Sequence, residues 1–286
     1  MKIGIQSAPY ERFGKDKFCK LKTHGFDAID YNMIDTQSEL YVLDDINFKK
    51  HLLAEKERAL DAGIIISQVH GPWRYPPCDS TKELRQERFE KMKKSILGTS
   101  FLGCKYWVIH PLMPYGTHDL GTENIQSTWN LNIEFFSKLV EFAKELDVTI
   151  CLENMPMRNF SISVPRQILK FVKEINDTHL QICLDTGHVA VFPDLDVSDV
   201  IRTLNTYIKV LHIHDNMGDK DSHMWPTKGI INWFDSIKAL KEIGYKGIFS
   251  LETIPADGLN DNDFEIKSVE LYNVFKNIID NVYSVI

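Results

Sequence analysis

The sequence is poor in the features that mark secreted and membrane proteins. Its five cysteines are odd in number and form no C-x-x-C pair, which argues for a reducing, cytoplasmic setting. No apolar run approaches the roughly 18 residues that a membrane span requires. The first residues, Met1–Ser7, read directly as a strand, so no signal peptide is expected. The cysteines are Cys19, Cys78, Cys104, Cys151 and Cys183.

Two further absences bear on the fold and on the partners of the protein. No glycine-rich phosphate loop follows the first strand, where Ser7-Ala-Pro-Tyr10 stands instead, and this disfavours a doubly wound dinucleotide-binding sheet. No basic block is present, and the net charge of −7 argues against nucleic acid or an anionic membrane as partner. Low-complexity linkers and short repeats are also missing, so we interpret residues 1–286 as one domain.

What the sequence does contain is an alternation of short β-rich runs with longer amphipathic segments. In the longer segments apolar residues recur at three- and four-residue spacing, as surface helices require. Gly63, Gly103 and Gly244 follow three of these segments, at the place where a left-handed residue often ends a helix. The expected helices are Asn47–Ala62, Thr81–Phe101, Thr122–Leu146, Val164–Ile175, Asn232–Ile243 and Asp263–Val282.

Eight strand–helix units in a chain of this length predict an α/β fold, namely a single (β/α)8 TIM barrel. In this fold the parallel strands are closed by an outer ring of helices, and active sites lie at the carboxyl ends of the strands. The expected strands are Lys2–Ser7, Asp27–Ile34, Ile64–His70, Tyr106–His110, Thr149–Glu153, Gln181–Asp185, Lys209–His214 and Gly247–Glu252.

Six consecutive strands end in ionisable residues. A buried parallel strand should be apolar, and an unpaired charge at its end is costly. Asp, Glu and His account for 50 of the 286 residues, so chance does not explain six such strand ends. Cys151 and Cys183 lie two residues before two of the carboxylates, and we interpret them as core residues one layer below the site. The strand-end residues are His70, His110, Glu153, Asp185, His212 with His214, and Glu252.

A converging set of carboxylates and imidazoles predicts a divalent metal site, because many carboxylates without a cation would repel one another. Such a donor set suits Mn²⁺, Co²⁺, Mg²⁺ or Zn²⁺. Two loops would add donors. His188 starts the loop expected after Asp185, and Asp221 and His223 form a D-x-H pair in the long polar loop after the seventh strand.

At these residues the sequence resembles the xylose isomerase-like TIM barrels, a superfamily that includes sugar epimerases and endonuclease IV (AP endonuclease family 2). The resemblance covers nearly the whole chain, and its markers in combination are specific to the superfamily but not to one reaction. The markers are Leu152-Glu153-Asn154, Leu184-Asp185-Thr186-Gly187-His188, His212-Ile-His-Asp215-Asn216 with Asp221 and His223 after it, and Leu251-Glu252.

The resemblance to ketose 3-epimerases implies one divalent metal held by Glu153, Asp185, His212 and Glu252, with His188 touching substrate hydroxyls. The resemblance to endonuclease IV implies a larger set of nine ligands for three zinc ions. One departure lies after the D-x-H pair, where relatives usually have a Gly-x-Gly turn and this chain has Pro-Thr-Lys-Gly at 226–229. This leaves the geometry of that loop open. The larger set would add His70, His110, His188, Asp221 and His223.

Charge around the expected barrel mouth favours a small neutral substrate over DNA. A protein that grips duplex DNA must neutralise phosphates with Lys and Arg. The loops expected on this face carry eleven acidic residues and four basic ones, Arg74, Arg158, Lys220 and Lys228. We therefore expect a small-molecule sugar or polyol substrate and no nucleic acid or membrane partner, while a homo-oligomer is left open. The scarcity of basic residues mildly favours a free sugar over a sugar phosphate, although one Arg or Lys would suffice to hold a phosphate. The loops counted are 71–80, 113–124, 155–163, 190–199, 216–229 and 254–263.

The predicted function is that of a divalent-metal-dependent sugar isomerase or epimerase. Glu153 and Glu252 would flank the reacting carbon, one removing a proton and the other returning it through a metal-stabilised enediolate. His188, His70 and His110 would contact substrate, and Trp73 and Trp225 would stack on the apolar face of a sugar ring. A dehydratase on the same scaffold and an endonuclease IV-like phosphodiesterase are the alternatives, followed by a non-catalytic binding protein.

Overall fold

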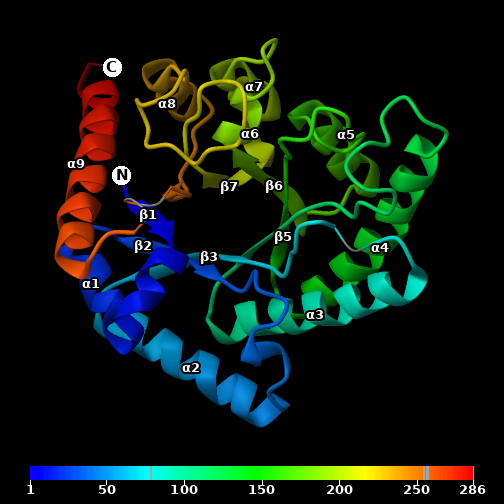
Figure 1. Cartoon of the computed structure of the whole chain (residues 1–286), viewed down its shortest axis with the longest axis horizontal. Coiled ribbons are helices and arrows are strands. Elements are labelled where there is room, and N and C mark those ends of the chain that lie inside the picture. Colours follow the sequence, from blue (N-terminus) through cyan, green and yellow to red (C-terminus); the bar gives the residue numbers. More distant parts are fainter. Residues whose placement is uncertain (78, 254, 256–257, 286) are drawn as a thin grey trace.

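The computed structural model describes residues 1–77, 79–253, 255 and 258–285, and in this part of the chain eight parallel strands form one curled sheet surrounded by helices (Figure 1). From β1 to β7 each strand pairs with the next strand in sequence, and β1 also pairs with β8. The strands are β1 (Ile3–Gln6), β2 (Ala28–Asn32), β3 (Ile65–His70), β4 (Tyr106–Ile109), β5 (Thr149–Glu153), β6 (Leu180–Asp185), β7 (Ile208–His212) and β8 (Phe249–Leu251).

The sheet closes on itself between β7 and β8. Just past the end of β7, the backbone N–H of Ile213 donates to the carbonyl oxygen of Ser250 at 2.8 Å. The N–H of Glu252 donates in turn to the carbonyl oxygen of Ile213 at 2.9 Å. These bonds bring the carboxyl ends of all eight strands to one face, so the prediction of a (β/α)8 barrel is confirmed.

The outer ring contains all six predicted helices, with their ends shifted by a few residues. Asp44 and Thr81 cap two of them, each accepting a hydrogen bond from a backbone N–H in the first turn. Gly63, Gly103 and Gly244 have φ angles of 68°, 71° and 71°, the left-handed conformation predicted after the helix ends. The six helices are α2 (Asp45–Asp61), α3 (Lys82–Phe101), α4 (Ile125–Glu145), α5 (Pro165–Ile175), α8 (Trp233–Glu242) and α9 (Asp261–Val285).

Three short helices were not predicted from the sequence, and the expectation of a loop directly after Asp185 is wrong. The helix that directly follows Asp185, α6 (Thr186–Ala190), has only five residues and is too short to show a periodic apolar face. Its start is set instead by the Asp185 carboxylate, which accepts a hydrogen bond from the backbone N–H of His188 at 2.5 Å. The additional helices are α1 (Lys17–Thr23), α6 (Thr186–Ala190) and α7 (Val197–Leu204), beside the 3₁₀ segments Ala8–Asp16, Glu39–Tyr41 and Asn205–Tyr207.

A small apolar cluster inside the barrel underlies the strand ends. It consists of Val108, Cys151, Cys183 and Val210, and it is separate from the main core between sheet and helices. The prediction that the two cysteines are core residues is therefore confirmed. Burial raises the pKa of the Cys151 thiol well above its ordinary value, so this thiol is neutral. The four cysteines within the described residues are free, and Cys78 lies outside them.

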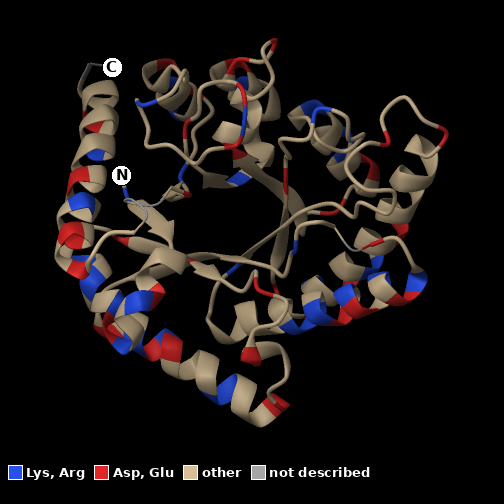
Figure 2. Cartoon of the chain, in the orientation of Figure 1, with Lys and Arg blue, Asp and Glu red and all other residues tan. Residues whose placement is uncertain are grey.

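Charged side chains are concentrated on the outer ring. Figure 2 shows Lys, Arg, Asp and Glu residues distributed along α2, α3 and α9. Among the described residues, no helix combines the length and the apolar character needed to cross a membrane. Of the rim residues counted in the sequence, Asp257 lies outside the described residues. At the barrel mouth, the ionisable residues Glu153, Asp185, His212 and Glu252 gather at the carboxyl ends of the strands.

Candidate metal centre

The side chains that end the strands converge at the mouth of the barrel. Glu153, Asp185 and His212 are the last residues of β5, β6 and β7, and Glu252 directly follows β8. One donor atom from each of the four lies within 4.8 Å of the others. The first three are fully buried, whereas the side chain of Glu252 is 15% exposed and reaches the solvent side. The barrel thus brings together the four residues predicted as the core of the site.

His212 lies at the centre of this group. Its Nδ1 is 3.1 Å from Oε1 of Glu153 and 3.1 Å from Oε2 of Glu252. Its Nε2 is 2.9 Å from Oδ2 of Asp30, and because a carboxylate only accepts, Nε2 carries the proton. Nδ1 then points a lone pair at two carboxylates. This arrangement is repulsive unless a proton or a cation lies between the three groups.

The donor set fits a divalent cation. Nδ1 of His212 and Oε2 of Glu252 are buried and have no hydrogen-bond partner among the described residues, whereas buried polar atoms normally have one. Three carboxylates and an imidazole are ligands that Mn²⁺, Co²⁺, Mg²⁺ and Zn²⁺ accept. Burial alone would lower the pKa of His212, but the nearby Cys183 sulfur and the carboxylates of Glu252 and Glu153 outweigh it and raise the pKa well above its ordinary value. Without a metal, a proton takes its place.

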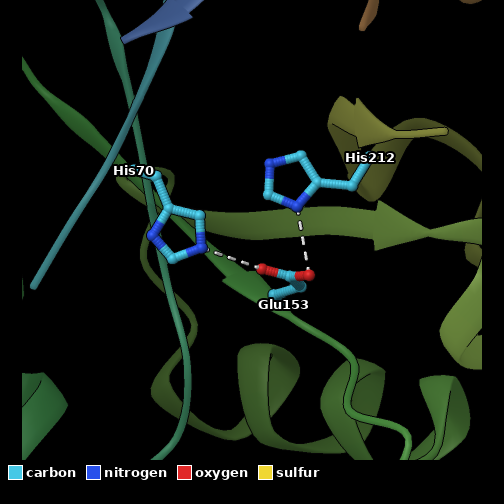
Figure 3. Close-up of side chains that lie close together, drawn as sticks. All are labelled: His70, Glu153 and His212. Carbon is cyan, nitrogen blue, oxygen red and sulfur yellow. Dashed lines mark ion pairs between the residues drawn. The ribbon is translucent and has the colours of Figure 1, made fainter. Parts of the chain in front are cut away.

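Two further histidines approach Glu153 from β3 and β4. Nε2 of His70 lies 3.5 Å from Oε2 of Glu153, and Figure 3 shows His70 and His212 meeting the two oxygens of this carboxylate. Nε2 of His110 lies 3.0 Å from Oε2 of Glu153. Burial would raise the pKa of Glu153, yet the surrounding imidazoles hold it well below its usual range. Burial lowers the pKa of His110 to about 4, so His110 is neutral near pH 7.

Helix α6 carries the donors next to this group. Asp185 caps the helix and places His188 one turn later, over the site. Nε2 of His214 lies 2.9 Å from Oδ2 of Asp185. A Cβ atom at Gly187 would lie 1.9 Å from the imidazole of His214, so the Asp-Thr-Gly-His run requires glycine at its third position. His188 from α6 and His214 from the segment after β7 therefore meet at one buried carboxylate.

Asp221 and His223 join His188 and His214 in a second group, here called the outer cluster. Nδ1 of His188 and Nδ1 of His223 each lie 2.7 Å from a backbone carbonyl oxygen, so each donates and carries the proton. Their Nε2 lone pairs then face Oδ2 of Asp221, at 3.1 and 3.4 Å. Burial would lower the pKa of His223, but the Asp221 carboxylate outweighs it and raises the pKa to about 10. The outer cluster thus also needs protons or a cation.

The loop after β7 keeps this geometry despite its unusual Pro-Thr-Lys-Gly run. Asp215 is buried and accepts hydrogen bonds from the indole N–H of Trp233 at 2.8 Å and from the backbone N–H of Thr227 at 3.1 Å. A Cβ atom at Gly229 would lie 2.1 Å from the carbonyl oxygen of Asn216, so only glycine fits there. The departure from the expected turn therefore does not prevent the D-x-H pair from reaching the site.

Two residues of the site were not assigned a role from the sequence. Asp30, in the middle of β2, is buried, holds Nε2 of His212 and accepts from the amide of Gln68 at 3.1 Å. His214 was noted on the seventh strand without a role, and it contacts both groups of ligands through Asp185 and Asp221. The signal for Asp30 was available, since a charge inside a strand buried on both faces needs a partner.

A cavity of about 550 Å³ opens above the site. The cavity is lined by Glu153, Glu252, His70 and His110, by His188, Asp221 and His223 of the outer cluster, and by several apolar side chains. Trp73 is one of these, and its ring meets His110 edge-on with 4.5 Å between the ring centres. Trp225 is not among the lining residues, and its ring lies 5.8 Å from Nζ of Lys267 on α9. The structure thus brings Trp73 to the site but not Trp225.

Comparison with known proteins gives a family match over most of the chain. The family described as xylose isomerase-like TIM barrel matches residues 18–268. A crystal structure of a D-tagatose 3-epimerase-like protein superimposes with a TM-score of 0.75 at 26% identity, covering 98% of this chain and 99% of that one. The matched range contains every residue of the two ligand groups.

The curated relatives are of more than one kind. An uncharacterized protein of Methanocaldococcus jannaschii is 30% identical over 64% of this chain, which spans 63% of the length of that relative. A D-psicose 3-epimerase of Ruminiclostridium cellulolyticum is 28% identical over 88% of this chain and 83% of its own length. A probable endonuclease 4 of Mycoplasmopsis agalactiae is 26% identical over 70% of this chain and 73% of its own length.

Proposed function

The chain belongs to the xylose isomerase-like TIM barrels, and we propose that it is a divalent-metal-dependent epimerase or isomerase of a sugar or polyol-derived substrate. One observation carries this proposal. Two glutamates from strands at different positions of the barrel, Glu153 and Glu252, face the same nitrogen of His212 at 3.1 Å and also line the cavity. The similarity to proteins named D-psicose and D-tagatose 3-epimerase supports it.

Glu153, Asp185, His212 and Glu252 would hold the metal in this proposal. When bound there, a divalent cation would supply Lewis-acid polarisation of a carbonyl and its neighbouring hydroxyl. Asp30 would orient the imidazole of His212 from behind, as carboxylates outside a metal site commonly do for ligating histidines.

The two glutamates would move the proton. The surrounding imidazoles hold the pKa of Glu153 and of Glu252 below the usual range against the effect of burial, so both are ionised at neutral pH. Either can therefore accept the proton on the carbon next to the carbonyl. The other returns a proton, first taken from solvent or a substrate hydroxyl, to the opposite face and inverts the centre. His188 and the neighbouring histidines would position the hydroxyls.

Deuterium exchange tests this function without knowledge of the natural product. Purified protein loaded with Mn²⁺ or Co²⁺ is incubated in D₂O with D-fructose, D-psicose or D-tagatose, and the product is followed by NMR and chiral chromatography. We expect deuterium on the carbon next to the carbonyl together with an inverted product. Glu153→Gln and Glu252→Gln should lower the rate by about 10²–10⁴-fold. Glu145→Gln, at an exposed position of the outer ring, serves as the control.

The metal content of each variant must be measured in the same preparations, because both glutamates are also proposed ligands. A variant that has lost its metal reports on binding rather than on proton transfer. Wild-type turnover by either glutamine variant with metal still bound would contradict the assignment.

The outer cluster supports a second candidate, an endonuclease IV-like phosphodiesterase with more than one metal. The Nε2 lone pairs of His188 and His223 both face Asp221, which suits a further cation, and His70 and His110 beside Glu153 would serve another. Against this candidate, no Lys or Arg is among the described residues lining the cavity. Three zinc ions per chain with cleavage of an abasic-site duplex at physiological salt would favour it. One metal with ketose exchange would remove it.

A further inference from the structure

The cavity above the metal centre has two chemically different sets of lining residues. One set consists of the carboxylates and imidazoles described above, which come from the ends of β3, β4, β5 and β8, from α6 and from the loop after β7. The other set consists of apolar and aromatic residues and is here called the apolar wall. The apolar wall consists of Ile34, Trp73, Tyr75, Met155, Pro156 and Met157.

Backbone hydrogen bonds fix the apolar wall in place. The N–H of Trp73 donates to the carbonyl oxygen of Ile34 at 3.0 Å, which ties the loop after β3 to the end of β2. The N–H of Met155 donates to the carbonyl oxygen of Ser163 at 2.9 Å, and the Ser163 hydroxyl donates back to the carbonyl oxygen of Met155 at 2.8 Å. The apolar surface is therefore preformed, as in ligand sites generally.

The outer end of the apolar wall is uncovered. Tyr75 is 69% exposed, with its ring centre 6.1 Å from that of Trp73. Large apolar side chains grouped at the mouth of a cavity commonly mark a binding surface. The aromatic pair extends the wall from the metal centre to the solvent, so a group held there would lie on the far side of a sugar from the reacting carbon.

The cationic side chains near this wall are not directed into the cavity: Arg74, between Trp73 and Tyr75 in the chain, lines a separate pocket together with Glu87. Among the described residues that line the cavity there is no Lys or Arg. Arg158, close in sequence to the three wall residues from β5, is held by the carbonyl oxygens of Val191 and Gly218. A phosphate on the distal end of a substrate would meet apolar surface without a counter-charge, which is costly.

We propose that the natural substrate is a sugar derivative that bears an uncharged alkyl or aryl substituent, and that this substituent lies on the apolar wall while the carbonyl end faces Glu153 and Glu252. This inference rests on the proposed function and specifies its substrate class. The volume of about 550 Å³ lies within the roughly 300–1,000 Å³ of pockets that enclose ligands of drug size.

Three ketoses that differ only at carbon 6 test the inference. D-fructose, 6-O-benzyl-D-fructose and D-fructose 6-phosphate share the same reacting end and offer a hydroxyl, an aryl group and a phosphate at the distal end. Binding to the Mn²⁺-loaded full chain is measured by calorimetry and deuterium exchange by NMR. We expect the benzyl compound to have a Kd at least about tenfold below that of D-fructose, since a single methylene in an apolar pocket is worth about tenfold or more.

Substitutions assign the gain to the wall. Trp73→Ala should bring the Kd values of the benzyl compound and D-fructose close together. Trp129→Ala on the outer ring should leave the ratio of these two Kd values unchanged. Tightest binding of the phosphate would overturn the inference, and so would equal binding of the benzyl compound and D-fructose. In both cases continued exchange with D-fructose leaves the proposed function intact. No exchange with any of the three ketoses would overturn the proposed function and the inference together.

Discussion

Asp30→Asn isolates the part of the metal centre that lies behind the ligands. Asp30 is buried in the middle of β2 and touches none of the four proposed ligands except His212, whose Nε2 it holds at 2.9 Å. The bond fixes which imidazole nitrogen carries the proton and leaves Nδ1 free to face Glu153 and Glu252. If His212 binds a metal, the loss of the Asp30 charge must weaken that binding.

The size of the effect follows from the chemistry of the bond. Hydrogen bonds to an ionised acceptor are about twice as strong as neutral ones. Loss of the outer partner of a ligating histidine costs about 10–100-fold in metal affinity, or about 1.4–2.8 kcal/mol. Asparagine keeps the shape of the side chain. Its new N–H can donate to Oε1 of Gln68, which is buried without a partner among the described residues. The fold should therefore survive the substitution.

Mn²⁺ titrated into chelator-treated protein, followed by calorimetry, measures this effect directly. We expect a Kd raised about 10–100-fold for Asp30→Asn, with a urea midpoint of the metal-free protein near that of the wild type. Asp119→Asn is the matched control, since Asp119 is also buried but accepts from the N–H of Ser161 at 2.7 Å and belongs neither to the ligand groups nor to the residues lining the cavity. A wild-type Kd for Asp30→Asn would refute the role of Asp30 in orienting His212.

Three further predictions concern stability. Chelation should lower the free energy of unfolding by about 2.7 kcal/mol relative to protein in metal at 100 times its Kd, seen as a lower Tm, and an unchanged Tm would show that no metal is bound. Gly187→Ala should cost about 1–3 kcal/mol in urea denaturation and weaken metal binding, because the new Cβ would lie 1.9 Å from the imidazole of His214. Burial lowers the pKa of His24 below 6.5, so its contribution to stability is present above pH 6.5 and is lost as pH falls through the folded pKa. His24→Gln should flatten this fall in urea midpoints, whereas exposed His51→Gln should not.

The strand ends could be predicted because each donor interrupts an apolar run at the same place. Glu153 and Asp185 follow four-residue runs of largely apolar character, and barrel closure alone then brings them together. Asp30 could not be assigned in this way. It lies inside a strand, and its partner His212 is 182 residues away, so only the register of the barrel brings the two together.

The position of Trp225 shows a second limit of the sequence. Two residues after His223, it was expected to share the site with that ligand. The backbone has positive φ angles at His223 (45°) and at Thr227 (78°), and Met224 bridges back to Asp215. These local turns direct the Trp225 ring towards α9. Hydrophobic periodicity carries no information about left-handed residues other than glycine, so a loop of this kind cannot be derived from spacing.

Backbone carbonyl groups decide which nitrogen three of the histidines present to the site. His70, His188 and His223 all donate Nδ1–H to backbone carbonyl oxygens, and each therefore presents Nε2 to a carboxylate. His212 is the reverse case, since its Nε2 is held by Asp30 and Nδ1 faces inward. Because these donors are oriented before any cation arrives, binding should require the release of protons but little movement of side chains. The barrel thereby supplies a preorganised set of lone pairs, and a cation bound there would complete a site whose geometry is already set by the fold.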